Sequence, residues 1–209
     1  MDSIFHGDLT SPSGRARAWI DALFVDHAIF RLVWTNAASV APGVLYRANH
    51  PTPGQLAALT RRWGLRTLIT LRGPTGNGSD ALAREAAARL GLRVIDMAMD
   101  SRGAPQPERI LRLAEIYREM APPALIHCKS GADRAGLAAG AQLSWRFGHM
   151  RRSRTGILDA FFLTYAAQAE GRVGFLDWVR DEYDPAALRR EFRAGGVASF
   201  LNDRVLGRE

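Results

Sequence analysis

The sequence predicts an α/β fold in which a central, mostly parallel sheet is flanked by helices and followed by a helical C-terminal extension. Short apolar segments alternate with helical segments as far as residue 127, a pattern typical of strand–helix–strand units. All later segments have helical periodicity alone. At 209 residues the chain has room for one well-buried core. We therefore expect a single domain over 1–209, with an N-terminal helix over 15–27, a core over about 28–150 and a helical extension over about 151–209.

The first half of the core is predicted to contain three strands and two helices. IFRLVW (29–34) alternates as a short strand would, with Phe30, Leu32 and Trp34 on one face. Pro53 fits the first turn of a helix, where its missing N–H leaves no bond unmade. The expected elements are strands over 29–34, 43–48 and 65–72, a helix over 54–63, and a helix from a cap at Ser79 or Asp80 to Leu90, closed by Gly91.

The second half of the core continues the alternation and ends in a strand. Apolar residues recur at helical spacing over 108–120, and the apolar segment PALIH (123–127) leads directly into Cys128. In parallel sheets ligands bind beyond the carboxyl ends of the strands, which is where this cysteine lies. The expected elements are a strand over 92–99, a helix over 108–120, a strand over 123–127, and helices over 134–147, 156–169, 173–181, 186–194 and, more weakly, 197–206.

The composition indicates a soluble protein of a reducing compartment. With 47% apolar and 23% charged residues, the chain is ordinary for a globular protein. Its start, MDSIFHGDLT, lacks the basic and apolar regions of a secretory signal, and charged residues interrupt even its most apolar segment, Trp19–Trp34. Cys128 is the only cysteine, so no internal disulfide can form. We therefore expect a cytoplasmic location.

The net charge of +7 is compatible with nucleic acid, an anionic membrane surface or phosphorylated molecules as partners. The arginines are spread along the chain without a nucleic-acid-binding motif, and most of them are expected to lie on solvated helix faces. We expect no nucleic-acid partner and no stable membrane insertion. The segment Trp19–Trp34 is expected to pack against the core rather than on a membrane, because its acidic residues would face an anionic bilayer.

The segment PALIHCKSGADRAG (123–136) contains the only cysteine and the only lysine, Cys128 and Lys129, side by side. A strand, a glycine-bearing loop and a helix beginning at Arg134 together form an anion site, since backbone N–H groups converge where the helix dipole favours negative charge. The dipole and Arg134 favour the thiolate of Cys128, which is the nucleophilic form.

The guanidinium fork of Arg134 can hold two oxygens of a phosphoryl group while the loop amides hold the others. Cys128 would attack phosphorus in line and form a phosphocysteine, which water then hydrolyses.

HCKSGADRAG resembles the phosphate-binding loop of the cysteine-dependent protein tyrosine phosphatases, whose pattern is His-Cys, five residues and then Arg. GVLYRANHPTPGQLAALTRRWGLRTLITLRG is similar to the upstream part of the dual-specificity-like branch found in bacteria and fungi. The resemblance covers roughly residues 40–147. It implies a protein tyrosine phosphatase-like fold and a hydrolase of phosphate monoesters.

The resemblance assigns a role to each residue of the loop. Cys128 would be the nucleophile and Arg134 the phosphate clamp, while His127 would orient the loop and help to keep the thiol ionised. Gly131 would relieve crowding where the backbone wraps the phosphate. The residues expected to contact the substrate are His127, Lys129, Ser130, Gly131 and Ala132, with Arg102 facing the substrate from an upstream loop.

Two aspartates compete for the role of general acid. Asp100 lies 28 residues before Cys128, on the loop where these enzymes usually carry a mobile acid. Asp133 lies inside the phosphate-binding loop, and related phosphatases with an aspartate there give it a proposed acid role. We slightly prefer Asp133, whose alternative role is to pair with an arginine. Many family members carry serine or threonine at the position of Ala135, where the hydroxyl helps the thiolate to leave, so slow turnover is a further hypothesis.

The sequence thus predicts a cysteine-dependent phosphatase that acts on phosphotyrosine, or with dual specificity, in proteins. A phosphoinositide or inositol phosphate is the alternative substrate, because Lys129 adds positive charge to the loop rim. An inactive phosphate-binding module is the alternative from another class. Arg72, at a strand end, is either structural or part of the pocket rim. We expect neither metal nor cofactor, since His6, His27, His50 and His149 lack metal-ligand spacing.

Overall fold

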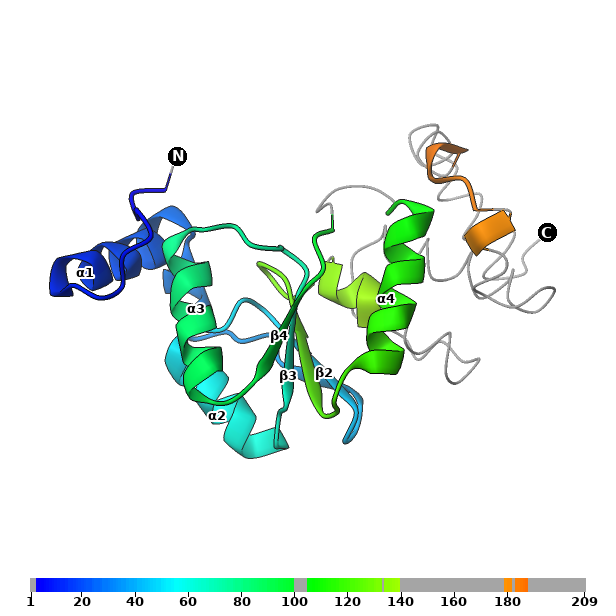
Figure 1. Ribbon diagram of the computed structural model, residues 1–209, viewed down its shortest axis with the longest axis horizontal. Coiled ribbons are helices and arrows are strands. Elements are labelled where there is room, and N and C mark those ends of the chain that lie inside the picture. Colours follow the sequence, from blue (N-terminus) through cyan, green and yellow to red (C-terminus); the bar gives the residue numbers. More distant parts are fainter. Residues whose placement is uncertain (1–2, 100–104, 133, 140–178, 182, 188–209) are drawn as a thin grey trace. The chain divides into compact units, whose positions relative to one another are not determined.

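The computed structural model describes residues 3–99, 105–132, 134–139, 179–181 and 183–187 (Figure 1). The chain divides into two compact units. The first consists of Met1–Ala98 and Met120–Ala135, and the second of Met99–Glu119 and Gly136–Glu209. The first unit contains the sheet and the loop that follows it. The single domain over 1–209 stays a prediction.

A five-stranded sheet forms the centre of the first unit, in the order β1-β2-β5-β3-β4 (Figure 1). β2, β5, β3 and β4 are parallel to one another, and only β1 runs antiparallel, beside β2. This arrangement confirms the α/β class with a mostly parallel sheet. The strands are β1 (Ala38–Ala41), β2 (Leu45–Ala48), β3 (Thr67–Thr70), β4 (Arg93–Asp96) and β5 (Ala124–His127).

β5 occupies the middle of the sheet, and every residue of β5 and of its neighbour β3 is buried. Helices α2 (Pro53–Trp63) and α3 (Gly78–Arg89) pack on one face of the sheet, because Leu56 and Ala87 join Leu68 and Leu125 in one apolar cluster. The burial of these apolar side chains stabilises the strand that ends immediately before Cys128.

The ends of the two helices follow from local chemistry. The hydroxyl of Thr52 accepts from Gln55 N–H, and the Gln55 side chain accepts from Thr52 N–H, which completes a capping box at the start of α2. The predicted cap of α3 at Ser79 or Asp80 is wrong. Asn77 is the cap, because its side-chain oxygen accepts from Asp80 N–H at 2.9 Å.

The N-terminal segment differs from the sequence prediction in one element. The predicted helix over 15–27 is present as α1 (Pro12–Ile20), continued by a π-helical turn over Asp21–Val25. The predicted strand over 29–34 is wrong, because Ala28–Arg31 forms a 3-10 turn. Arg31 points inward to Asp26, whereas Leu32, Val33 and Trp34 are exposed one after another. A strand buries every second side chain, so this segment has no apolar face that a strand could bury.

The second unit contains α4 (Pro107–Glu119), which matches the predicted helix over 108–120. The hydroxyl of Tyr117 donates to the carbonyl of Ala138, and that of Tyr183 donates to the carbonyl of Pro105, each at 2.7 Å. Residues 134–139, 179–181 and 185–187 are helical, as predicted. The rest of the predicted helical extension, including 156–169 and 197–206, lies outside the described residues.

Across the described residues, no helix combines the length and the apolar character that crossing a bilayer requires.

Candidate active site

Cys128 follows the last residue of β5 and lies inside the turn of the next three residues. Its side chain is only 1% exposed, and the N–H of Gly131 donates to its Sγ at 3.2 Å. The carbonyl of His127 accepts from Leu71 N–H at 2.9 Å, which holds the end of β5 against the segment after β3. The thiol therefore sits at the carboxyl end of the central strand, where the sequence predicts it.

Gly131 allows the loop to lie directly on the end of β2. Its φ angle is +72°, in the left-handed region that favours glycine. A Cβ at this position would lie 2.5 Å from the backbone nitrogen of Asn49 and 2.6 Å from the carbonyl carbon of Ala48. Any larger side chain would push the loop away from the sheet.

Three successive carbonyls of the loop accept hydrogen bonds from the surrounding scaffold. The carbonyl of Lys129 accepts from His50 N–H at 3.2 Å, that of Ser130 from Asn36 Nδ2 at 3.1 Å, and that of Gly131 from Arg47 Nη1 at 2.7 Å.

In a planar trans peptide the carbonyl and the following N–H point in opposite directions. Anchoring the carbonyl of Ser130 outward therefore turns Gly131 N–H toward the Sγ of Cys128, as observed. The loop can thus present its N–H groups to an anion.

Two arginines contact the backbone around the loop that carries the thiol. Arg134 begins the helical residues 134–139, and its Nη1 donates to the carbonyl of Leu71 at 3.3 Å. Arg47 lies in β2, where burial lowers the pKa of its guanidinium while the charge of Cys128 acts in the opposite direction. The sequence indicates Arg134 as a phosphate clamp, but it gives Arg47 no role.

His127 is a neutral imidazole at physiological pH. Burial is the main cause that lowers its pKa to about 3, and the nearby charge of Arg72 acts in the same direction. Its ring meets the ring of His50 edge to face, with 4.7 Å between the centroids. A neutral ring adds no positive charge beside Cys128, so an effect of His127 on the thiol would have to come from orienting the loop.

The side chain of Lys129 is paired with a carboxylate from the N-terminal segment. Lys129 Nζ lies 3.3 Å from Asp26 Oδ1. Asp26 is buried, and its carboxylate also accepts hydrogen bonds from Nη1 and Nη2 of Arg72 at 2.8 Å and from Nη2 of Arg31 at 2.7 Å. Burial alone would raise the pKa of Asp26, but the two arginines outweigh it and lower the pKa.

Arg72 also fixes the orientation of His50. Arg72 Nη1 lies 3.0 Å from His50 Nδ1, and His50 Nε2 lies 3.2 Å from the carbonyl of Ser79. Since arginine can only donate, Nδ1 accepts and Nε2–H donates to Ser79. The sequence left Arg72 either a structural role or a place on the pocket rim. Its contacts with Asp26 and His50 are those of a structural residue.

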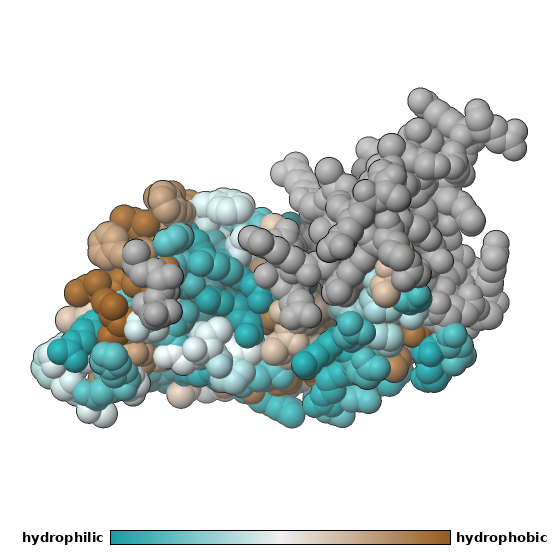
Figure 2. All heavy atoms as spheres, turned by 90° about the horizontal axis from the view of Figure 1, so that it is seen from above, coloured by the Kyte–Doolittle hydropathy of each residue, from teal (hydrophilic) through white to brown (hydrophobic). Residues whose placement is uncertain are grey.

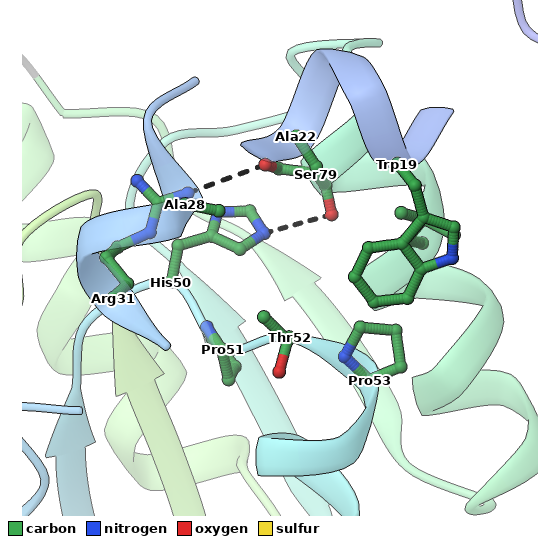
Figure 3. A pocket seen from close by; sticks show the side chains of 10 residues that line it. Trp19, Ala22, Ala28, Arg31, His50, Pro51, Thr52, Pro53 and Ser79 are labelled. Atoms are coloured by element: carbon green, nitrogen blue, oxygen red, sulfur yellow. Dashed lines mark hydrogen bonds between the residues drawn. The ribbon is translucent and has the colours of Figure 1, made fainter. Parts of the chain in front are cut away.

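A small pocket lies behind this network (Figure 3). His50 and Arg31 point toward Ser79 on one side of it, and Trp19, Pro51 and Pro53 form its apolar side. The side chains that line it do not include any predicted site residue of the described chain. The chemistry of Cys128 therefore belongs to the loop and not to this pocket.

The structure brings together seven of the predicted site residues on one loop and the start of the next helix: His127, Cys128, Lys129, Ser130, Gly131, Ala132 and Arg134. Asp133, Asp100 and Arg102 lie outside the described residues. Sequence reasoning missed Asn36, Arg47 and Asp26. Arg47 had one usable signal, because it lies near the carboxyl end of a strand that was expected in the sheet.

Metal-binding clusters of three or more His, Cys, Asp or Glu side chains do not occur in the described part of the chain.

Several solved structures are similar to this chain at low sequence identity. The core catalytic domain of the PP-IP phosphatase SIW14 from S. cerevisiae has a TM-score of 0.46 and 17% identity, covering 78% of this chain and 93% of that chain. P. aeruginosa TpbA has a TM-score of 0.46 and 22% identity, over 76% of this chain and 91% of that chain. Tk-PTP in its active form has a TM-score of 0.49 and 18% identity, over 68% of this chain and all of that chain. No curated protein matches the sequence significantly.

A family comparison covers the sheet and the loop. Residues 36–158 match the sequence model of the family described as "DSP-PTPase phosphatase fused to NAD+ Kinase". The matched region is more than half of the chain and includes the whole segment from Cys128 to Arg134. The chain therefore belongs to this family of cysteine-dependent phosphatases.

Proposed function

We propose that the protein hydrolyses phosphate monoesters through a phosphocysteine on Cys128, with phosphotyrosine or dual-specificity sites in proteins as its substrates. The observation that carries the proposal is the hydrogen bond from Gly131 N–H to Cys128 Sγ within a loop whose carbonyls are anchored outward. A nucleophile and a set of anion-binding N–H groups thus occupy one place, as phosphoryl transfer requires.

In the first step the sulfur of Cys128 forms a bond to phosphorus as the bond to the ester oxygen breaks. Arg134 and the loop N–H groups hold the equatorial oxygens, whose charge rises in the transition state. The leaving oxygen takes a proton from Asp133, or from Asp100 if that residue is the acid. Water then attacks phosphorus and gives a proton to the carboxylate left by the first step, while the bond between sulfur and phosphorus breaks; this releases inorganic phosphate and restores both the thiolate and the acid.

A phosphoinositide or an inositol phosphate is the second substrate class. Lys129 supports it, because its side chain is 44% exposed at the rim of the loop and carries a positive charge. The pairing with Asp26 offsets part of this charge, which favours the protein substrates. We further propose that the enzyme is bacterial and works in the cytoplasm, where a single unpaired thiol stays reduced.

The test is phosphate release from an aryl phosphate, a panel of phosphopeptides and a panel of inositol phosphates, with a chelator present. We expect activity that survives chelation and disappears in Cys128→Ser, while the variant still binds phosphate. The preferred substrate then chooses between the two classes. Activity in Cys128→Ser equal to that of the native protein would rule out the thiolate mechanism.

The remaining alternative is an inactive module that binds phosphate without releasing it. Ala135 keeps this alternative open, since it is fully buried in the first turn after Arg134 and has no hydroxyl to assist the leaving thiolate. For a slow enzyme we expect a burst of product followed by a slow steady state, and Ala135→Ser should raise the steady rate several-fold. A native protein that binds the substrates without a burst would be the binding module.

A further inference from the structure

Seven large apolar side chains are exposed at the end of helix α1 and in the short segment that follows it. They form a surface that we call the apolar surface: Ile20, Phe24, Ile29, Phe30, Leu32, Val33 and Trp34. Figure 2 shows apolar atoms gathered at the end of the molecule where α1 lies. Single exposed apolar residues are normal, but a contiguous group of this kind marks a site of interaction.

The acidic residues of the same segment are turned into the protein. Asp21 is buried and accepts from the backbone N–H groups of Ile4 and Gly78, at 2.8 and 2.7 Å. Asp26 is buried against Arg31 and Arg72. The segment is thus held with its carboxylates inside and its aromatic rings outside, the reverse of the usual arrangement. This removes the sequence-based reason against a membrane, because neither carboxylate faces outward.

Within residues 9–36 the exposed charge is basic, whereas Asp8, just before this range, is exposed and accepts from Thr10 and Ser11. Between residues 9 and 36, all of which the structure describes, Asp21 and Asp26 are the only acidic residues and both are buried. The exposed ionisable side chains of this range are Arg17 and His27. The whole chain carries +7. Two copies of such a chain repel one another, whereas an anionic bilayer attracts it.

We propose that the apolar surface docks peripherally onto an anionic lipid bilayer. Phe24, Phe30 and Trp34 would enter the boundary between headgroups and acyl chains, where aromatic rings are favoured. Basic charge would add attraction to the headgroups, at a distance limited by salt screening. The partner is a lipid surface of negative charge, and no helix needs to span it.

The apolar surface is joined to the loop that carries Cys128. Asn36 Nδ2 donates to the carbonyl of Ser130 at 3.1 Å, and Asp26 pairs with Lys129 at 3.3 Å, both from the segment that bears the apolar side chains. Docking would therefore bring the loop close to the lipid surface. If the loop binds phosphate as proposed above, phosphorylated substrates held at the membrane would be closer to Cys128 than substrates free in solution.

The test is co-sedimentation of the full chain with vesicles of phosphatidylcholine alone and of phosphatidylcholine mixed with phosphatidylserine. Phe30 and Val33 are 72% and 94% exposed, so Phe30→Glu and Val33→Glu should leave the fold intact. Ala58→Glu, at an exposed position of α2, adds the same charge elsewhere and is the matched control.

We expect binding to the mixed vesicles that weakens with added salt, and a loss of about tenfold in partitioning for each variant of the apolar surface but not for Ala58→Glu. Equal binding by all four proteins, or no binding to the mixed vesicles, would overturn the proposal. So would a dimer in sedimentation velocity that Phe30→Glu dissociates, because a second copy would then cover the surface. Hydrolysis of a soluble aryl phosphate should not change in these variants, which separates this test from that of the catalytic function.

Discussion

Lys129 Nζ and Asp26 Oδ1 lie 3.3 Å apart, so the loop that carries Cys128 is tied to a carboxylate of the N-terminal segment. Asp26 also joins Arg31 and Arg72, and its own side chain is buried. The lysine at the rim and the two arginines thus share one negative charge.

Asp26→Asn should strongly destabilise the protein, because the buried Arg31 and the largely buried Arg72 would lose their counter-charge. Removing one partner of a buried pair typically costs about 3–5 kcal/mol. Urea unfolding of the native protein and the variant at neutral pH measures this difference. Glu115→Gln is the matched control, since it breaks an exposed pair with Arg112 and should leave the midpoint unchanged. Equal midpoints for Asp26→Asn and the control would show that the buried network contributes nothing.

The pH dependence of Asp26 has a definite sign. The lowered pKa means that the unfolded state takes up a proton more readily than the folded state as the pH falls. The contribution of Asp26 is therefore complete above the ordinary carboxyl pKa of about 4 and is lost below it. The difference in stability between the native protein and Asp26→Asn should shrink as the pH is lowered from about 4.

The two buried histidines should make the protein less stable in a different pH range. Burial first, and then nearby positive charge, lowers the pKa of both His50 and His127, the latter to about 3. In the unfolded chain they titrate near 6.5, so protons bind the unfolded state first and stability falls below that pH.

We expect a loss of up to about 1.4 kcal/mol per pH unit for each histidine. Urea midpoints from neutral pH to pH 5 should therefore decline, and His127→Asn should reduce the slope, while His6→Gln, at an exposed position, serves as the control. A native midpoint that stays constant over this range would contradict a neutral buried pair.

Gly131→Ala should distort the loop more than its φ angle alone requires. Gly43→Ala is the matched control, because Gly43 has a φ of +74° and open space around it, whereas a Cβ on Gly131 would meet backbone atoms at 2.5 and 2.6 Å. The positive φ accounts for about 1–2 kcal/mol in both variants, and the clash adds to it only at Gly131. Thermal unfolding and phosphatase assays of both variants distinguish the two effects. Equal losses would mean that the neighbouring backbone gives way.

Arg47→Gln should lower kcat more than it raises KM, because Arg47 positions the loop through the carbonyl of Gly131 at 2.7 Å. A displaced loop reduces the rate by about 100-fold in comparable cases. Arg47→Lys should recover part of the rate, since it keeps a donor. Arg93→Gln removes the same charge from an exposed position and is the control. Unchanged kinetics in Arg47→Gln would show that the bond to Gly131 is dispensable.

Local patterns were sufficient for most of the sheet and for the loop. The apolar segments around β2, β3 and β5 are confirmed as strands. Parallel strands that are buried on both faces are written as short continuous apolar runs, and this pattern is easy to recognise in a sequence. His127 to Arg134 could be placed because strand, glycine and helix follow one another directly in the chain. The predicted strand over 29–34 is wrong because the alternation of apolar residues suggested a buried face. The pairing of Arg31 with Asp26 cannot be predicted from the residues next to it in the sequence.

Asp26 and Arg47 were missed for a related reason. Each acts through a partner far away in the sequence, Asp26 on Lys129 and Arg47 on Gly131. Such contacts exist only once the strands are assembled side by side, and neither residue belongs to a motif with a known role. β1 was missed because a four-residue edge strand has too little periodicity to be recognised.

The anchoring of the loop by its carbonyls has a consequence for how the specificity of this enzyme can change. The scaffold donates hydrogen bonds to the main-chain carbonyls of residues 129–131, and every amino acid has such a carbonyl. Of these three residues, Gly131 is the one whose side chain is restricted by close backbone atoms. The side chain of Ala132 can therefore be exchanged without dismantling the cradle, and that of Ser130 at the loss of the one hydrogen bond that its hydroxyl accepts from Ala132 N–H at 3.4 Å. A library randomised at these two positions should yield folded proteins with altered substrate preference, so natural divergence and laboratory selection would both begin there.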